Sequence, residues 1–414
     1  MARLVMKFGG TSVGDLDRIR NVARHVQREV NAGYEVAVVV SAMSGETNKL
    51  VALCRTAAVL HDAREYDAVV SSGEQVTAGL LAIVLQGNGV NARSWQGWQI
   101  PISTNNAHSS ARIAAIPADT LTEKIGQGQV AVIAGFQGIA PDNRIATLGR
   151  GGSDTSAVAI AAAIGAERCD IYTDVDGVYT TDPRIVANAR RLDKVSFEEM
   201  LEMASLGSKV LQVRSVELAM VHGVRTFVRS SFDDPAAPQS GNPTGTLICD
   251  EDEIVEKQLV TGIAYSRDEA KITLRGVEDK PGVAAAIFGP LAETGINVDM
   301  IVQNVSEDGK ATDITFTVPV ADFERSKASI EGMKGSVAMK SVAGSSDVAK
   351  VSVIGIGMRS HAGVAAQAFQ ALASRGINIQ LITTSEIKIS VLIDAAYTEL
   401  AVRTLHSIYE LDKT

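Results

Sequence analysis

The sequence predicts an α/β protein, with a three-layer, mostly parallel sheet domain followed by two small repeated units. Up to about residue 230, short apolar runs alternate with amphipathic helical segments, which is typical of parallel strands covered by helices on both faces. Residues 233–246 are rich in Pro, Gly, Asp and Ser and lack periodicity, which indicates a domain boundary. Residues 282–297 match residues 363–378 at 10 of 16 positions without a gap, which is an internal repeat offset by 81 residues.

The elements follow from these patterns in chain order. Each copy of the repeat reads as strand, helix, Gly-Ile-Asn turn and two strands, a βαββ unit whose sheet can pair side by side with that of the other copy. We therefore expect domains at residues 1–246, 247–342 and 343–414. In the first domain we expect strands at 4–8, 35–41, 129–135, 169–173 and 225–228, with helices at 16–32, up to about 86, after Ser153, and at 196–222.

Composition narrows the classes of function. The 414 residues are 46% hydrophobic and 21% charged, with a formal net charge of −9 and no block of Lys and Arg, which argues against a nucleic-acid or acidic-membrane partner. Apolar runs fall far short of about 18 residues and no signal region precedes them, so we expect a cytoplasmic protein without a membrane span. The three cysteines and six histidines form no ligand-like cluster, so neither a disulfide framework nor a metal site is expected.

Two glycine-rich turns are the candidate binding sites. Residues 149–157 place a cation, three glycines and a carboxylate before a run of small residues, which suits a backbone cradle for an anion at a helix start. Lys7 ends the first strand directly before Gly9 and Gly10, where its ammonium can reach phosphate oxygens. For residues 149–157 taken alone, the alternative interpretation is a surface turn in which Ser153 or Asp154 caps the helix. No dinucleotide fingerprint stands in its strand–turn–helix setting and no P-loop occurs, which argues against an NAD-dependent dehydrogenase.

The segments 7–12, 149–157 and 173–179 together resemble the aspartate kinases of the amino acid kinase family, and the resemblance covers essentially the whole chain. The repeat resembles that family's pair of ACT domains, which are ferredoxin-like βαββαβ effector binders. The resemblance implies phosphorylation of the L-aspartate side-chain carboxylate by ATP, giving 4-phospho-L-aspartate, the first step of lysine, threonine and methionine biosynthesis. Mg²⁺ would arrive bound to the ATP phosphates. A carboxylate nucleophile is already ionised at neutral pH, so no general base is needed.

The same resemblance assigns roles to single residues. Lys7 and Lys209 would neutralise the transferring phosphoryl group, and Asp154 would hold these ammonium groups in place. Glu74 would receive the amino group of the substrate, although a glutamate that opens a helix is also favourable through the helix dipole alone. Arg150 would bind the α-carboxylate. The remaining substrate contacts would be Ser41, Thr47, Gly151, Gly152 and Ser153, and the nucleotide contacts would be Lys7, Gly9, Gly10, Thr173, Asp174, Tyr179, Arg184 and Lys209.

For the repeats, the resemblance implies feedback inhibition by lysine and threonine together. It further implies a homodimer or higher oligomer that forms through the ACT domains. A shorter chain made from an internal translation start could associate with this oligomer. Because the chain ends soon after the second repeat, we expect a monofunctional enzyme without a fused dehydrogenase. Two alternatives stay open: a sibling kinase acting on glutamate, acetylglutamate or UMP, and a non-catalytic amino-acid sensor. The threonine contacts would be Asp279, Gly282, Ala284, Gln303, Asn378 and Ile379, and those of lysine would be Asp299, His361 and residues 384–386.

Overall fold

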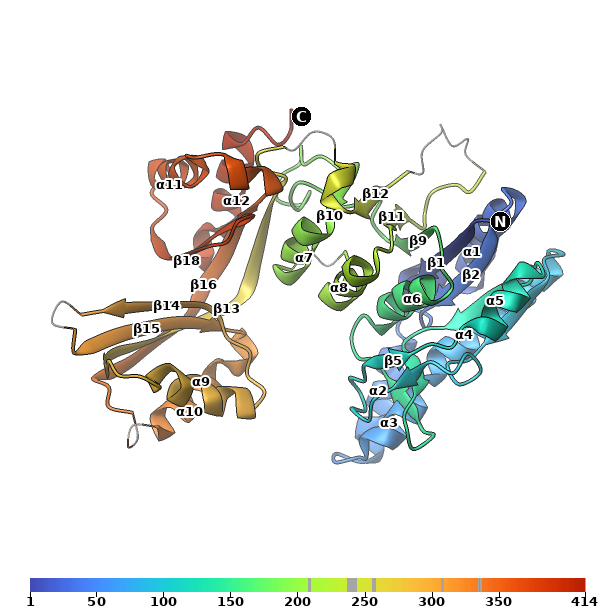
Figure 1. The fold of residues 1–414 in the computed structure, drawn as a ribbon, viewed down its shortest axis with the longest axis horizontal. Coiled ribbons are helices and arrows are strands. Elements are labelled where there is room, and N and C mark those ends of the chain that lie inside the picture. Colours follow the sequence, from blue (N-terminus) through green and yellow to red (C-terminus); the bar gives the residue numbers. More distant parts are fainter. Residues whose placement is uncertain are drawn as a thin grey trace. The chain divides into compact units, whose positions relative to one another are not determined.

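The computed structural model describes residues 1–207, 210–236, 244–254, 258–306, 309–333, 335 and 337–413. Within these ranges the chain forms two compact units (Figure 1). The first unit contains residues 1–178, 191–205 and 210–254, and the second contains residues 179–190, 206–207 and 258–413.

The first unit is built on an eight-stranded sheet in which every pair is parallel except β11 with β12. Its central strands β1, β2 and β6 are largely apolar runs with side chains buried on both faces, as parallel sheets covered by helices require. Across the sheet the strands are β10 (Lys194–Ser196), β12 (Thr246–Cys249), β11 (Thr226–Ser230), β9 (Arg168–Thr173), β1 (Arg3–Phe8), β2 (Glu35–Val40), β6 (Val130–Ala134) and β3 (Ala92–Trp95).

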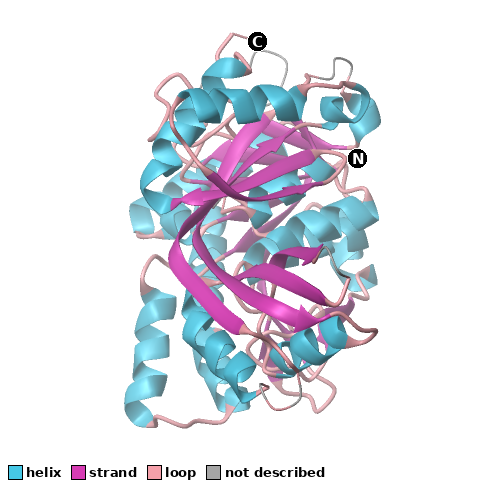
Figure 2. Ribbon diagram, turned by 90° about the vertical axis from the view of Figure 1, so that its left-hand side faces the viewer, coloured by secondary structure: helices cyan, strands magenta, loops and turns pink. Residues whose placement is uncertain are grey.

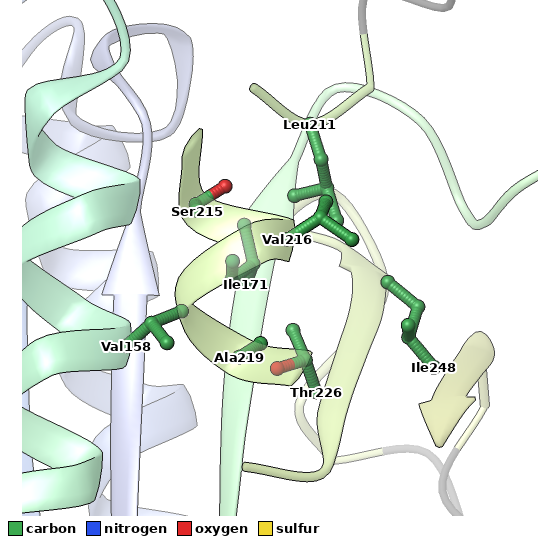
Figure 3. A pocket seen from close by; sticks show the side chains of 8 residues that line it. All are labelled: Val158, Ile171, Leu211, Ser215, Val216, Ala219, Thr226 and Ile248. Carbon is green, nitrogen blue, oxygen red and sulfur yellow. The ribbon is translucent and has the colours of Figure 1, made fainter. Parts of the chain in front are cut away.

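Helices cover both faces of this sheet and make three layers. Helices α1 (Leu16–Asn31) and α4 (Ser72–Gly87) pack on the face that carries Leu4, Met6 and Phe8 of β1. Lys7 alternates with these residues and therefore points to the opposite face, where α6 (Gly152–Ala163) lies. Also in the unit are α5 (Asp119–Gly126), α7 (Phe197–Ser205) and α8 (Val213–His222), and Figure 3 shows apolar side chains of α8 meeting those of α6, β9 and β12.

A smaller, four-stranded sheet adjoins this core. Its strands are β5 (Ile113–Ala115), β4 (Ser103–Thr104), β7 (Gln137–Ile139) and β8 (Ile145–Thr147), in that order. Helices α2 (Glu46–Ala57) and α3 (Ala63–Val70) also belong to the unit, together with the 3-10 turns η1 (Gly10–Val13) and η2 (Glu251–Glu253).

Helices α3 and α4 are nearly continuous, and the stretch Ala63–Gly87 is long and apolar enough to cross a membrane by length and composition alone. Such a stretch is weak evidence for a span, because core helices of soluble proteins pass the same test. Here α4 buries Ala78, Leu81 and Leu85 against the sheet.

The second unit is built on one six-stranded sheet rather than on two separate ones (Figure 2). Two long strands, β13 (Gly262–Glu278) and β16 (Ser341–Ile354), pair antiparallel at its centre. The first repeat packs α9 (Val283–Glu293) and α10 (Phe323–Gly332) on its half of the sheet, and the second packs α11 (Val364–Ser374) and α12 (Thr398–Ile408) on the other half. The other strands are β14 (Asp299–Val305), β15 (Ala311–Val318), β17 (Ile379–Thr384) and β18 (Lys388–Asp394), and the 3-10 turns are η3 (Val320–Asp322), η4 (Ile356–Ser360) and η5 (Ala395–Tyr397).

The fold class predicted from the sequence is confirmed, but three local features differ. The single helix expected over 196–222 is wrong: α7 ends at Ser205 and α8 begins at Val213, because Gly207 takes a left-handed φ of 97° that a helix cannot contain. Strand β12 lies after the turn-rich segment and still belongs to the first sheet, so that sheet extends beyond residue 246. Strand β16 runs across the expected boundary between residues 342 and 343. Residues 237–243 of the turn-rich segment lie outside the described residues.

Candidate active site

A cavity of about 470 Å³ opens in the first unit where the carboxyl ends of β1, β2 and β9 meet the start of α6. The crevice beyond the carboxyl ends of parallel strands is where ligands bind in open α/β sheets. Most of the substrate and phosphate residues expected from the sequence line this cavity, although they come from five separate segments. They are Lys7, Gly9, Gly10, Ser41, Thr47, Glu74, Arg150, Gly151, Gly152, Ser153, Asp154 and Thr173.

Lys7 and Asp154 form an ion pair at the wall of the cavity, with 2.5 Å between Lys7 Nζ and Asp154 Oδ1. Both residues are 8% exposed, so the pair is little screened by water. Lys7 is the second-last residue of β1, and Asp154 lies in the first turn of α6. The geometry therefore fixes an ammonium group at the cavity wall.

The glycines after β1 allow the chain to pass close to its neighbours. A side chain at Gly10 would place its Cβ 3.1 Å from the carbonyl oxygen of Ala42, which is tighter than an ordinary contact. The backbone N–H of Gly9 donates to Tyr172 O at 3.2 Å, which ties this turn to β9. Thus the turn after β1 is held by the sheet itself.

The turn before α6 is a left-handed entry to the helix. Gly149 and Gly151 have φ values of 77° and 68°, which L side chains rarely adopt. A Cβ on Gly151 would come within 1.9 Å of Gln212 Cγ, so only glycine fits there. Arg150 stands exposed between them. The backbone N–H of Gly152 donates to Gly149 O at 3.0 Å and closes the turn, and Ser153 follows it in the first turn of α6, beside the cavity. A helix N-terminus beside a guanidinium group favours an anion.

Glu74 is the only carboxylate of the cavity that we expect to meet the substrate, and it is 3% exposed. Its Oε1 accepts a hydrogen bond from the backbone N–H of Ala42 at 3.0 Å. Its Oε2 is buried and has no hydrogen-bond partner among the described residues. Burial raises the pKa of Glu74 to about 7, and the hydrogen bond from Ala42 offsets only part of that effect. A cationic group in the cavity would supply the missing partner.

The residues expected to surround the nucleotide are divided in the structure. Thr173 lines the cavity, and its hydroxyl donates to Asp174 Oδ1 at 3.1 Å. Tyr179 and Arg184 belong to the second unit, where Arg184 forms an ion pair of 2.8 Å with Asp182 and leaves most of its side chain exposed. Lys209 lies outside the described residues.

Several lining residues were missed by the sequence analysis, and Phe136 is the clearest of them. It lies one residue beyond β6, after Gly135, and has a φ of 69°; its ring atom Cδ2 lies 2.8 Å from the Cβ that Gly152 would carry if it had one. Its position after a third parallel strand was a usable signal, because that strand ends at the same edge as β1 and β2. The other lining residues not anticipated are Thr11, Ala42, Met43, Ser44 and Gly45.

The residues expected to bind effectors all lie in the second unit. Asp279, Gly282 and Ala284 are exposed around the turn between β13 and α9, and Gln303 is exposed on β14. Asp299 is already paired, because Lys350 Nζ lies 2.5 Å from its Oδ2 and 2.8 Å from Glu269 Oε1. The others are His361, whose Nδ1 contacts Gly357 O at 2.9 Å, Asn378 before β17, Ile379 at its start, and residues 384–386 at its end.

Comparison with known proteins gives consistent results along the chain. The profile of the amino acid kinase family matches residues 2–230, and ACT domain profiles match residues 272–331 and 351–409. An aspartate kinase of Stutzerimonas stutzeri is 53% identical over 413 residues, which is 100% of this chain and 98% of the relative. An aspartokinase of Corynebacterium glutamicum is 45% identical over 416 residues, covering 99% of this chain and 97% of its own length.

Solved structures are similar over nearly the full length as well. Aspartokinase III of E. coli in complex with aspartate and ADP, in the R-state, is 28% identical with a TM-score of 0.81, covering 98% of this chain and 99% of the other. The same E. coli enzyme with lysine and aspartate, in the T-state, gives a TM-score of 0.76 at the same identity and the same two coverages.

Proposed function

This chain belongs to the aspartate kinases of the amino acid kinase family, which phosphorylate aspartate with ATP, and we propose which of its residues perform that reaction. The observation that carries the proposal is the buried Oε2 of Glu74, which has no partner in the described part of the chain, in the same cavity as the exposed guanidinium of Arg150. An amino acid offers one ammonium group and one α-carboxylate, and these two side chains match them. The E. coli relative was solved with aspartate bound, which supports an amino-acid ligand here.

In the proposed complex, Arg150 and the N–H groups that begin α6 bind the α-carboxylate, while Glu74 binds the amino group. Ser41 and Thr47 donate hydroxyl hydrogen bonds from the loop after β2. The side-chain carboxylate of aspartate is then free to face the turn after β1. It is ionised at neutral pH, so one of its oxygens attacks the γ-phosphorus of ATP without a general base, while the bond from that phosphorus to the bridging oxygen breaks and ADP leaves.

Lys7 neutralises the charge that develops on the transferring phosphoryl group, and Asp154 keeps its ammonium in place. Asp154 acts through Lys7 and does not take a proton. Gly9 and Gly10 let phosphate oxygens approach the backbone N–H groups of the turn. Lys209 is proposed as a second ammonium at the phosphates on the sequence motif alone.

Thr173, Asp174, Tyr179 and Arg184 are proposed as contacts for the rest of the nucleotide. We propose that Mg²⁺ arrives bound to ATP phosphates, because Asp154 is engaged by Lys7. The ion would supply charge neutralisation at the phosphates.

The second unit is proposed to bind lysine and threonine as joint feedback inhibitors of the first step of a pathway that makes lysine, threonine and methionine. Support comes from its two ACT matches and from the lysine complex of the E. coli relative. An effector inhibits only if it favours one conformation over another. Since Lys350 already neutralises Asp299, a lysine ligand would share or displace that ammonium.

We also propose a cytoplasmic location for the protein. Its ACT domains lead us to propose a homodimer or higher oligomer that forms through them. The edge strands β14 and β17 of the six-stranded sheet carry exposed apolar side chains, Ile301, Val305 and Ile382. Edges of this kind favour pairing with another chain.

A coupled assay of ADP release with L-aspartate as acceptor tests the proposal, with glutamate, acetylglutamate and UMP as competing acceptors. We expect turnover with aspartate alone, and inhibition that is stronger with lysine and threonine together than with either one. Glu74→Gln should raise the KM for aspartate by about 10-fold to 100-fold and leave the KM for ATP unchanged, because it removes a charge-assisted hydrogen bond.

Glu167→Gln is the matched control, since Glu167 is an exposed glutamate of the same unit and should leave both constants unchanged. Turnover with another acceptor and none with aspartate would contradict the proposed substrate. An equal rise of both KM values in the Glu74 variant would contradict the role given to that residue.

A further inference from the structure

Asp67 is a fully buried carboxylate that the proposed mechanism does not use. It lies on α3, and Thr147 at the end of β8 donates to it twice, through its hydroxyl at 2.6 Å and its backbone N–H at 3.1 Å. His108 Nδ1 donates at 2.8 Å and the backbone N–H of Ser109 at 3.0 Å. An ionised carboxylate only accepts hydrogen bonds, so Asp67 suits this ring of donors. It thereby joins the loop 105–112 to the end of β8.

Arg214 joins the same two segments from another helix. This residue of α8 donates through Nη1 to Leu148 O at 2.8 Å and through Nη2 to Ala111 O at 2.9 Å. The segments also touch directly, because the backbone N–H of Ala111 donates to Thr147 O at 2.9 Å. We call the contacts of Asp67 and Arg214 with these two segments the turn clamp.

The turn clamp ends where the proposed aspartate site begins. Leu148 precedes Gly149, whose backbone lies so close to the loop that a Cβ there would be 3.1 Å from Ser109 O. Arg150 follows, and among the described residues it forms no ion pair or hydrogen bond of its own. The backbone turn beneath it therefore sets where its side chain starts and which part of the cavity its guanidinium can reach. The turn after β1, by contrast, is tied to β9 through Gly9 and does not depend on these contacts.

We propose that Asp67 and Arg214 are positioning residues that hold the turn at Gly149 so that Arg150 faces the substrate carboxylate. This inference rests on the proposed function of the cavity. It assigns the loop 105–112, which does not line the cavity, to the support of aspartate binding. A small displacement of a binding group can cost a large factor in rate or affinity, so loosening this support should affect aspartate selectively.

Asp67→Asn tests the proposal, because an amide nitrogen would face donors that need an acceptor. In the full-length protein we expect a KM for aspartate raised by on the order of tenfold, with the KM for ATP unchanged. Amide hydrogen exchange, measured without substrates, should quicken in residues 105–112 and 147–153. Thr147→Val removes only the 2.6 Å hydroxyl contact and should shift both readouts in the same direction to a smaller extent. If Asp67→Asn fails to fold, the KM values and the amide exchange of Thr147→Val test the proposal in its place.

Asp170→Asn is the matched control. Asp170 is equally buried, and its partners Arg168 and Arg229 do not line the cavity. It should lower stability without quickening exchange at 147–153 or separating the two KM values. Unchanged amide exchange in the Thr147 variant, or an equal rise of the KM values for aspartate and ATP, would overturn the proposal that the turn clamp positions Arg150. If the unmodified protein fails to turn over aspartate, the proposed function fails, while the exchange data still decide whether the contacts hold the turn.

Discussion

Glu74 offers a direct test of the electrostatics of the cavity through the stability of the protein without ligands. Burial raises its pKa from 4.5 to about 7 in the folded chain. Between these values the unfolded carboxyl has lost its proton while the folded one keeps it. The folded state therefore loses stability as pH rises from 4.5 to about 7 and loses no more above that. At about 1.4 kcal/mol for each pH unit, the loss amounts to about 3 kcal/mol.

Glu74→Gln removes this titration and keeps an oxygen that can accept from Ala42. We expect the variant to gain about 3 kcal/mol relative to the unmodified chain between pH 4.5 and pH 8. Urea unfolding followed by tryptophan fluorescence measures the stability of the first unit, because both tryptophans, Trp95 and Trp98, lie in it. Glu167→Gln serves as the exposed control. A stability difference that stays constant from pH 4.5 to pH 8 would refute the reasoning.

The ionisation of Glu74 should also appear in catalysis, because only the charged carboxylate attracts the amino group of the substrate. We expect kcat/KM for aspartate to rise as the pH passes about 7. A flat pH profile would count against Glu74 as the contact of the amino group. Asp154→Asn should lower kcat by on the order of 100-fold with little change in KM for aspartate, because Lys7 loses the partner that holds it; initial rates of ADP release check this. Gly151→Ala should lower the free energy of unfolding by more than Gly33→Ala, since both positions have left-handed φ values but only the former meets a neighbour; equal losses in urea titrations would show that the contact with the neighbouring side chain does not matter. Gln303→Ala should raise the threonine concentration needed for half-inhibition while uninhibited turnover stays intact, and a parallel loss of both would argue against an effector contact.

Several residues that line the cavity could be singled out from the sequence because their signals are local. Lys7 precedes two glycines at the end of an apolar run, and Arg150 lies between glycines before a helix. Once a parallel sheet is predicted, the ends of its strands must lie at one edge, so these distant motifs converge. Phe136 was missed because it belongs to no motif, and the only signal for it was its place just beyond β6, at the edge where β1 and β2 also end.

Features that depend on pairing between distant segments were not predictable in the same way. The repeat suggested two consecutive units, yet β13 and β16 are each long enough to serve both halves of one sheet. Strand β12 returns to the first sheet after a segment rich in turn formers, which reads as a boundary in the sequence. Asp67 gave no signal either, because its donors lie about 40 and 80 residues along the chain. Such contacts follow from topology and not from local pattern.

The two carboxylates of the cavity differ in a way that fits the order of the proposed reaction. Asp154 is paired with Lys7 before any ligand binds, so the ammonium needed at the phosphates is in place at no further cost of reorganisation. Glu74 has one buried oxygen for which the described residues offer no partner, and the protein bears that cost until a cation arrives. The binding energy of an ammonium ligand is increased by the relief of this penalty, whereas a ligand without an ammonium group gains nothing from it. The same buried carboxylate that destabilises the empty site therefore contributes to the selection of an amino acid as the acceptor.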